Sequence, residues 1–291
     1  MTESEVVIDV DGGLISGTLV THEEALNSAV SIIIAGSGPT DRNGNQEGLR
    51  NDSLEKISTS LLRHQYASFR FDKRGVGKSC FPSLLESDLT IDTYVKDIHS
   101  IIQTLSDEYG FRTFNLIGHS EGGLIALLVA QTACINSLVL IATPALSFAE
   151  NLTKQYRLRA PQFTEDVKTI LEAIKRGKAI QCGCEHLSLV FRPSVIPYIK
   201  SCYFIDPLAI ASTLSRPIHV IQGDNDIQVE AMNGMMFEEV LGKSFVRLTM
   251  CKGMNHVLVR SFKDNDQNIH TYHDPTQPIH PKLQNALIDA L

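Results

Sequence analysis

A serine between two glycines is the residue of this chain best suited to chemistry. It is Ser120, in the pentapeptide Gly-His-Ser-Glu-Gly at 118–122. Residues 113–117 before it are strand-like and apolar, and residues 123–130 after it are apolar on nearly every side, as in a buried helix. A tight turn between strand and helix presents a serine hydroxyl outward, and a side chain at either glycine would collide with the neighbouring strand or helix. The pattern predicts that Ser120 is a nucleophile.

A serine hydroxyl is a poor nucleophile, so it needs a general base and a partner that orients the base. In sheets with this turn the partners follow in the order Ser, Asp or Glu, His. His256 comes just after the last predicted strand, in a short loop that would carry it over the serine. His270, His273 and His280 lie in a polar tail that is more typical of a solvated surface. We therefore predict that His256 is the base.

Two aspartates are candidates for the orienting acid. Asp224 and Asp226 both follow a predicted strand that ends near Gly223, where strand ends deliver ligand-facing groups. One of the two has an ordinary explanation, because aspartate often bonds its own backbone in a turn or caps the next helix. We assign Asp226 to the triad and Asp224 to the turn, and the opposite assignment stays open.

An oxyanion hole needs two convergent N–H donors. One is expected from the residue after the nucleophile, Glu121, and the other from the loop that follows the third strand, at 35–40. This loop holds two glycines and a proline, which suits a backbone turned inward. Ser37 is the predicted second donor and Gly38 is the alternative; an ordinary turn would have the same composition.

Strands and helices alternate along most of the chain, which predicts a doubly wound parallel sheet that positions these loops. A hairpin of two β-rich runs, 6–10 and 14–20, comes first. Further strands are expected at 30–35, 66–71, 113–117, 137–142, 217–221 and 244–250. Helices are expected at 53–63, 90–109, 123–130, 229–241 and 282–291, with a polar loop through Pro281 before the last one.

The alternation breaks between Pro144 and Ser215, which predicts a helical lid inserted at 144–215 into a core formed by 1–143 and 216–291. The lid should set substrate size. Its large apolar side chains suggest an acyl pocket, although most of them would also serve to pack the lid: Phe148, Leu152, Tyr156, Phe163, Leu187, Phe191, Tyr198 and Phe204.

Composition excludes several other classes of function. The chain has 291 residues, 43% of them hydrophobic, and a formal net charge of −7 without a basic stripe, so we expect no nucleic-acid partner. No apolar run is long enough to span a bilayer and no secretory signal is visible, so we expect a cytoplasmic protein with free thiols at its six cysteines. We expect no metal, because the pair Cys182 and Cys184 lacks further ligands at a suitable spacing. The segment 75–79 resembles a phosphate-binding loop, but Asp72 stands where that motif needs glycine.

The residues resemble the α/β-hydrolase superfamily over nearly the whole chain. The stretch Gly-Ser-Gly-Pro-Thr-Asp-Arg-Asn-Gly-Asn at 36–45 resembles a bacterial branch of serine esterases with that oxyanion loop. Residues 71–79, which contain Asp-Lys-Arg-Gly, are similar to the superfamily's segment after the fourth strand, and 253–256 and 271–275 also resemble the esterase branch. Many relatives carry His-Gly before the oxyanion loop, where this chain has Ala35-Gly36. The resemblance implies an α/β-hydrolase fold, a mostly parallel central sheet flanked by helices.

The resemblance also implies hydrolysis of carboxylic esters through Ser120, Asp226 and His256, without a cofactor. The expected substrate is a small-molecule ester with a short or medium acyl group, cleaved through an acyl-enzyme. A serine peptidase or amidase, or a thioesterase, of the same fold is the alternative, because this fold hosts several chemistries. A non-catalytic relative that binds a ligand is a further alternative. The sequence predicts no oligomeric state.

Overall fold

A central sheet of eight strands organises the molecule. The computed structural model describes residues 2–22, 29–262 and 264–291. The strand order is β1-β2-β4-β3-β5-β6-β7-β8. Strand β2 is antiparallel to both of its neighbours, β1 and β4, and the strands β4, β3, β5, β6, β7 and β8 run parallel to one another. The strands are β1 (Thr2–Val10), β2 (Gly13–Thr21), β3 (Ala29–Ile34), β4 (Ala67–Phe71), β5 (Thr113–His119), β6 (Ser137–Ile141), β7 (Ile218–Gly223) and β8 (Val246–Cys251).

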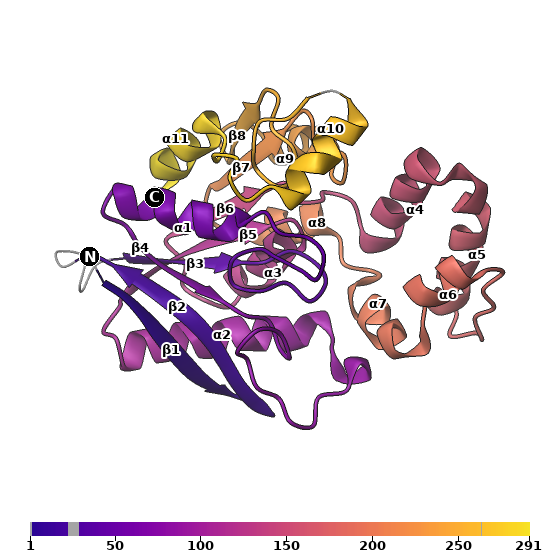
Figure 1. The fold of residues 1–291 in the computed structure, drawn as a ribbon, viewed down its shortest axis with the longest axis horizontal. Helices are drawn as coiled ribbons and strands as arrows, with labels where there is room; N and C mark the ends of the chain where they lie inside the picture. The colour runs from indigo at the N-terminus through magenta and orange to yellow at the C-terminus, as the bar shows by residue number, and fades with distance from the viewer. Residues whose placement is uncertain (1, 23–28, 263) are drawn as a thin grey trace.

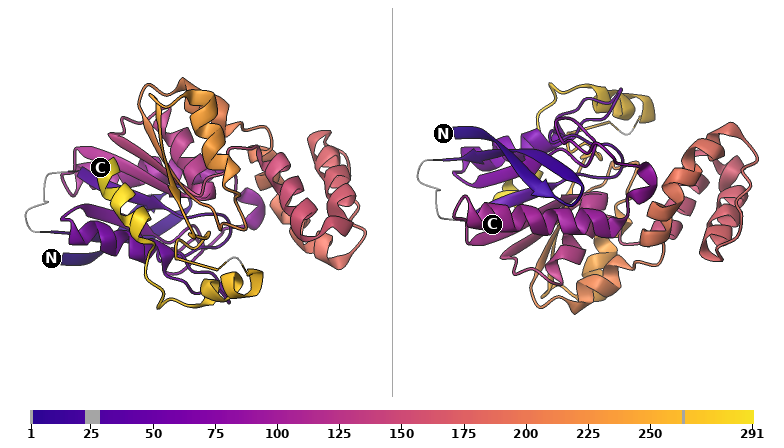
Figure 2. Two further views of the ribbon diagram at one scale, coloured as in Figure 1. Left: turned by 90° about the horizontal axis from the view of Figure 1, so that it is seen from above. Right: turned by 90° about the horizontal axis from the view of Figure 1, so that it is seen from below.

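Helices cover both faces of the sheet (Figures 1 and 2). Helices α2 (Ile91–Asp107), α3 (Glu121–Ala130), α8 (Pro207–Thr213) and α9 (Met232–Leu241) contribute to one apolar core. Helices α1 (Ser53–Arg63) and α11 (Pro281–Ala290) close a second core on the opposite face. Because both faces are covered, the central strands are buried along nearly their whole length and are mainly apolar, as Val30 and the three isoleucines at 32–34 of β3 illustrate. The predicted mostly parallel sheet flanked by helices is confirmed.

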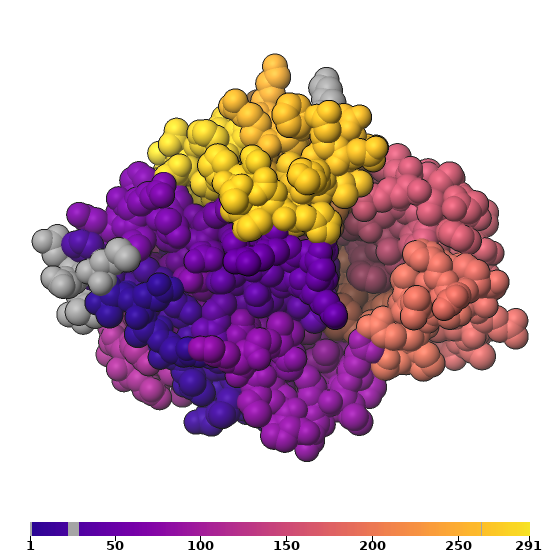
Figure 3. Space-filling model, viewed as in Figure 1, coloured from indigo at the N-terminus to yellow at the C-terminus, as the bar shows by residue number. Residues whose placement is uncertain are grey.

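A helical lobe lies between β6 and β7 in the chain. It contains α4 (Phe148–Arg159), α5 (Thr164–Lys175), α6 (Glu185–Val190) and α7 (Ile196–Cys202). Its helices share an apolar core of their own, which includes Tyr156, Val167, Ile170, Leu187 and Phe191. Figure 1 shows the lobe beside the sheet, and Figure 3 shows a hollow between the lobe and the rest of the molecule. The segment expected at 144–215 is thus helical, and its action as a lid stays a prediction.

Two expectations about local structure were wrong. The predicted helix at 229–241 begins only at Met232, because Asp226 holds the preceding residues in a turn. The tail before Pro281 is not only a polar loop: it contains α10 (Asn265–His270) and a single 3₁₀ turn at Thr271–His273. Helix α10 and the 3₁₀ turn were missed because two of their three buried residues, Asn268 and Thr271, are polar, and Tyr272 alone makes no apolar periodicity. Among the described residues no helix is long and apolar enough to cross a membrane.

Candidate active site

Ser120 lies at the sharp turn between β5 and α3. Its backbone has φ 56° and ψ −123°, a combination that a residue with a side chain rarely adopts. The turn is held by the Ser120 N–H, which donates to the Ile141 carbonyl at 2.8 Å. A methyl group at Gly118 would overlap the backbone of Gly122, and one at Gly122 would overlap the end of β3. The two glycines therefore permit the close approach of strand and helix that exposes the serine.

Asp226 and His256 meet at the same edge of the sheet. Asp226 follows β7 and His256 follows β8, and parallel neighbours deliver their carboxyl ends to one edge. The Asp226 Oδ2 lies 2.8 Å from the His256 Nδ1, and the Asp226 side chain is fully buried. Its Oδ1 accepts from the N–H groups of Gln228 and Val229 at 2.7 and 2.9 Å. The carboxylate is fixed at both oxygens, so it holds the imidazole with Nδ1 protonated and leaves Nε2 as the basic nitrogen.

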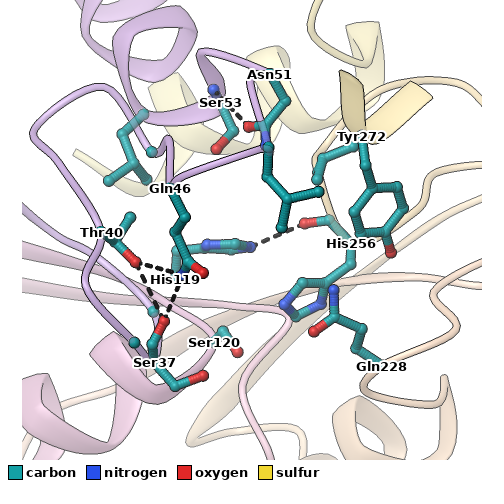
Figure 4. Close-up of a pocket in the computed structure, with 16 residues that line it drawn as sticks. Ser37, Thr40, Gln46, Asn51, Ser53, His119, Ser120, Gln228, His256 and Tyr272 are labelled. Carbon is teal, nitrogen blue, oxygen red and sulfur yellow. Dashed lines mark hydrogen bonds between the residues drawn. The ribbon is translucent and has the colours of Figure 1, made fainter. Parts of the chain in front are cut away.

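Ser120 and His256 line one pocket of about 250 Å³ (Figure 4). Their side chains make no hydrogen bond to each other in the described part of the chain. Hydrogen bonds between a nucleophile and its base commonly tighten only in the complex with substrate, so this separation is compatible with proton transfer. The structure thus brings all three candidates from distant parts of the chain to one place.

The two candidate oxyanion donors lie on either side of Ser120. Glu121 is the first residue of α3, where a backbone N–H has no partner within the helix. Ser37 lines both of the pockets that Ser120 borders, whereas the alternative, Gly38, lines only one of those two. The Gly36 carbonyl accepts from the Lys73 Nζ at 3.0 Å. Because the C=O and N–H of a trans peptide point in opposite directions, the Ser37 N–H points away from Lys73.

Polar side chains hold the loop that contains Ser37. The Ser37 carbonyl accepts from the Gln46 Nε2 at 2.7 Å and from the Thr40 hydroxyl at 3.1 Å. Arg42 donates to Asp72 through its backbone N–H and through two guanidinium nitrogens, at 2.8, 3.1 and 2.7 Å. The segment after β4 therefore fixes the loop. Asp72, whose carboxylate makes the segment 75–79 unsuited to bind phosphate, is the partner of Arg42.

His119 is a residue of the site for which the sequence analysis proposed no role. It is buried, its Nε2 donates to the His256 carbonyl at 2.9 Å, and the centroids of the two rings lie 4.8 Å apart. Burial, together with the neighbouring His256, lowers the pKa of His119 to about 3, so the ring is neutral at ordinary pH. His119 ties the backbone of His256 to the elbow strand. Its position beside Ser120 was the only available sign.

A buried amide network supports the loop that carries His256. The Asn255 Nδ2 donates to the Asn268 Oδ1 at 2.8 Å and to the Thr271 hydroxyl at 2.6 Å. Asn268 in turn donates to the Asn225 carbonyl at 2.9 Å, so the network also reaches the loop of Asp226. The segment with α10 and the 3₁₀ turn therefore connects the loops of acid and base. No apolar pattern in the sequence predicts this segment.

The rejected candidates lie outside the Ser120 pocket. Asp224 accepts from the Gly253 N–H at 2.5 Å and makes no contact with the imidazole of His256 that would orient it. His270 and His273 are exposed, as expected for a solvated tail. His280 is buried and its Nε2 donates to the Lys252 carbonyl at 3.1 Å, which corrects the expectation that it is solvated. In the described ranges no three His, Cys, Asp or Glu side chains are grouped to hold a metal ion.

Sequence comparison relates parts of the chain to known hydrolases. Residues 51–183 match the family described as "Serine aminopeptidase, S33", a range that includes Ser120 but neither Asp226 nor His256. Esterase EstD of Thermotoga maritima is 22% identical over 230 residues, which are 78% of this chain and 54% of EstD. The chain thus spans about half the length of this curated relative.

Solved structures of similar shape cover nearly the whole chain. Est1E from Butyrivibrio proteoclasticus matches 92% of this chain and 94% of its own with a TM-score of 0.57 at 17% identity. The Pyrococcus furiosus esterase Pf2001 matches 88% of this chain and 83% of its own with a TM-score of 0.59 at 18% identity. Together with the sheet order and the strand–elbow–helix turn at Ser120, these similarities establish that the chain has the α/β-hydrolase fold.

Proposed function

We propose that the protein is a serine hydrolase that cleaves carboxylic esters through an acyl-enzyme. The observation that carries the proposal is the buried Asp226–His256 pair, 2.8 Å apart, in the loops next to a serine held at φ 56°. A serine on such a strained turn, with a base whose tautomer is fixed, is the arrangement that activates a hydroxyl.

The reaction follows from the roles of these side chains. Ser120 Oγ attacks the carbonyl carbon while His256 Nε2 takes its proton, and Asp226 stabilises the imidazolium that forms. The N–H groups of Ser37 and Glu121 bind the negative charge on the carbonyl oxygen. The imidazolium then gives its proton to the leaving alcohol. Water attacks the acyl-enzyme by the same route, which releases the acid and restores Ser120.

Esters are favoured over peptides by the charges around Ser120. An aminopeptidase has to bind the ammonium group of its substrate, and a carboxylate suits that task. Of the residues that line the two pockets at Ser120, the only carboxylate is that of Glu121, and it is already paired with Lys73 at 3.4 Å. The match to the family described as a serine aminopeptidase is the observation that favours an amide substrate, and we keep it as the second candidate.

The segment 144–215 is proposed to act as a lid that limits the size of the acyl group. Phe148 and Leu152 of α4 line the pocket behind Ser120, so the lobe contributes directly to the substrate site. By contrast, Tyr156, Leu187 and Phe191 pack inside the lobe. The cytoplasmic location expected from the sequence stays a prediction.

Labelling of Ser120 tests the proposed function. The wild type should react with a fluorophosphonate probe and hydrolyse p-nitrophenyl butyrate, and Ser120→Ala should lose both, with kcat lower by about 10⁴- to 10⁶-fold. Aminoacyl p-nitroanilides, assayed in parallel, separate an esterase from a peptidase. A wild type that is neither labelled nor active on p-nitrophenyl acetate or butyrate would leave the non-catalytic, ligand-binding alternative.

A further inference from the structure

Two pockets of different chemistry meet at Ser120. The polar pocket, about 250 Å³, is the one drawn in Figure 4, and the apolar pocket, about 230 Å³, lies toward the helical lobe. Ser37, Ser120 and Gln228 line both, so a substrate bound at Ser120 can extend into each. An ester has two halves, and the two pockets provide one place for each.

The polar pocket is lined by uncharged groups: the apolar side chains of Leu49, Leu54 and Val257, and several neutral hydrogen-bonding side chains. Thr40, Gln46, Asn51, Ser53 and Tyr272 contribute hydroxyl and amide groups, and none of the lining residues is Asp, Glu, Lys or Arg. A carboxylate or phosphate in this pocket would be partly desolvated without a counter-ion, which is unfavourable. The lining therefore fits a ligand that is polar but uncharged.

The apolar pocket has a different lining. Its walls include Leu124, Pro144, Leu146, Phe148 and Leu152. Hydrocarbon buried against such walls is stabilised in proportion to its area. This pocket suits a short alkyl chain.

The position of the base decides which half of the ester enters which pocket. His256 has to protonate the oxygen of the leaving alcohol, so that alcohol must lie on the side of the imidazole. His256 lines the polar pocket and does not line the apolar one. The polar pocket is therefore the place of the alcohol, and the acyl group extends past Glu121 into the apolar pocket.

The hydrogen-bonding side chains around the polar pocket fit a hydroxylated ligand. Tyr272 is 8% exposed, and its buried hydroxyl interacts with the side chain of Gln228, which also lines the pocket. Figure 4 shows the Tyr272 hydroxyl on the side of the pocket where Gln228 lies. The side chains of Gln46, Asn51 and Ser53 line the same pocket. A buried polar group without a partner is costly, and a ligand hydroxyl can both donate and accept.

We propose that the alcohol half of the substrate is an uncharged polyol or monosaccharide bound in the polar pocket, and that the acyl half is a short alkyl chain in the apolar pocket. The inference rests on the proposed ester hydrolysis and names the substrate class of the same site. The polar pocket holds about eight times the share of liquid volume of one water molecule, which suits a ligand of one sugar ring.

A series of butanoate esters that differ only in the alcohol tests the proposal. The esters of glycerol and glucose are compared with those of n-butanol and n-hexanol, and kcat/KM is measured by titration of the acid released. The polyol esters should be preferred by about 10-fold or more, because each satisfied buried group contributes a few-fold. A preference of the wild type for the alkyl esters overturns the proposal.

Tyr272→Phe removes the buried hydroxyl and keeps the ring. The variant should lower the ratio of kcat/KM for the glucose ester to that for the hexyl ester by about 3- to 10-fold. Ser60→Ala is the matched control: it deletes another buried hydroxyl, in α1 and outside the pocket, and should leave the ratio unchanged. An unchanged ratio in Tyr272→Phe contradicts the proposal. If the wild type has no detectable activity on polyol, alkyl or p-nitrophenyl esters, the proposed function fails as well. Activity on p-nitrophenyl butyrate but on none of the other esters refutes only the proposed substrate class.

Discussion

Lys73 connects both arms of the candidate oxyanion hole, and its removal should affect stability and catalysis together. The side chain is 4% exposed, and its ammonium group donates to the Gly36 carbonyl at 3.0 Å and lies 3.4 Å from the Glu121 carboxylate. It also lies over the Tyr94 ring, 4.3 Å from the centroid. Burial lowers the pKa of Lys73, and Glu121 opposes that shift. The perturbation is Lys73→Met, which keeps most of the length of the side chain and removes its charge.

The magnitude follows from what the substitution leaves behind. The Glu121 side chain is 13% exposed, so Lys73→Met leaves a nearly buried carboxylate without its cation. Breaking a buried pair by removing one partner costs about 3–5 kcal/mol, whereas replacing both partners is often close to neutral. The double variant Lys73→Met, Glu121→Gln should therefore be more stable than Lys73→Met alone. The coupling free energy should be about 2 kcal/mol or more.

Catalysis should respond through the loop of Ser37. Without Lys73 the Gly36 carbonyl loses its donor, and the N–H of Ser37 is no longer held in the orientation that we propose for the oxyanion hole. One oxyanion donor is worth about 10²–10³ in kcat, so a misplaced donor should cost about 10- to 100-fold in Lys73→Met. Glu121→Gln keeps its own backbone N–H, and the double variant should recover stability more fully than kcat, because the Gly36 carbonyl still lacks its partner.

Urea unfolding and the hydrolysis of p-nitrophenyl butyrate measure the two effects. Lys78→Met is the matched control, since Lys78 is a neighbouring lysine whose side chain is 68% exposed, and it should change neither stability nor kcat appreciably. Additive free energies in the double-mutant cycle would refute the coupling between Lys73 and Glu121. A Lys73→Met variant that is destabilised with unchanged kcat would refute the role of Lys73 in placing Ser37.

Two further predictions concern the other side chains around His256. Burial lowers the pKa of His119 to about 3 in the folded protein. In the unfolded chain this histidine binds a proton below about pH 6.5, whereas in the folded protein it does so only near pH 3. Stability should thus fall as the pH drops from 6.5 toward 3, by up to about 1.4 kcal/mol per pH unit from this residue. Urea unfolding measures how much unfolding free energy each protein loses between pH 7 and pH 5. His119→Gln should lose about 2 kcal/mol less than the wild type, and equal losses would contradict the prediction. Asp226→Asn should lower kcat by about 10³- to 10⁴-fold and Asp224→Asn by less than 10-fold, since only Asp226 contacts the imidazole; the reverse order in a p-nitrophenyl butyrate assay would exchange their roles.

The elements of the fold could be predicted where the pattern is local. The strand expected at 14–20 is found at Gly13–Thr21, and the helix expected at 53–63 has those bounds. Apolar periodicity and turn residues carry this information within a window of a few residues. Likewise, the turn at Ser120 and the loops after β7 and β8 could be expected to meet, because a parallel sheet aligns the ends of its strands.

The supports of the site could not be predicted, because they depend on contacts between distant polar residues. Lys73 meets residues 37 and 48 positions away in the chain, and Asn255 is held by residues in α10 and the 3₁₀ turn after it. A lysine or an asparagine in a sequence is most often solvated, so its type alone predicts an exposed side chain. Burial of such a residue is a property of the assembled fold.

Stability and function depend on different kinds of residues in this molecule: apolar residues in the cores and polar residues around the site. The two large cores consist of apolar side chains on either face of the sheet, and they fix the sheet to which β5, β7 and β8 belong. At the edge of that sheet, by contrast, the positions of Ser37, Asp226 and His256 depend on a few hydrogen bonds with polar neighbours. Loss of a polar side chain at this edge leaves the cores intact but allows a loop to shift slightly. Catalysis is sensitive to small displacements of the reacting groups. Activity should therefore be more sensitive than folding to changes in the loops around Ser120.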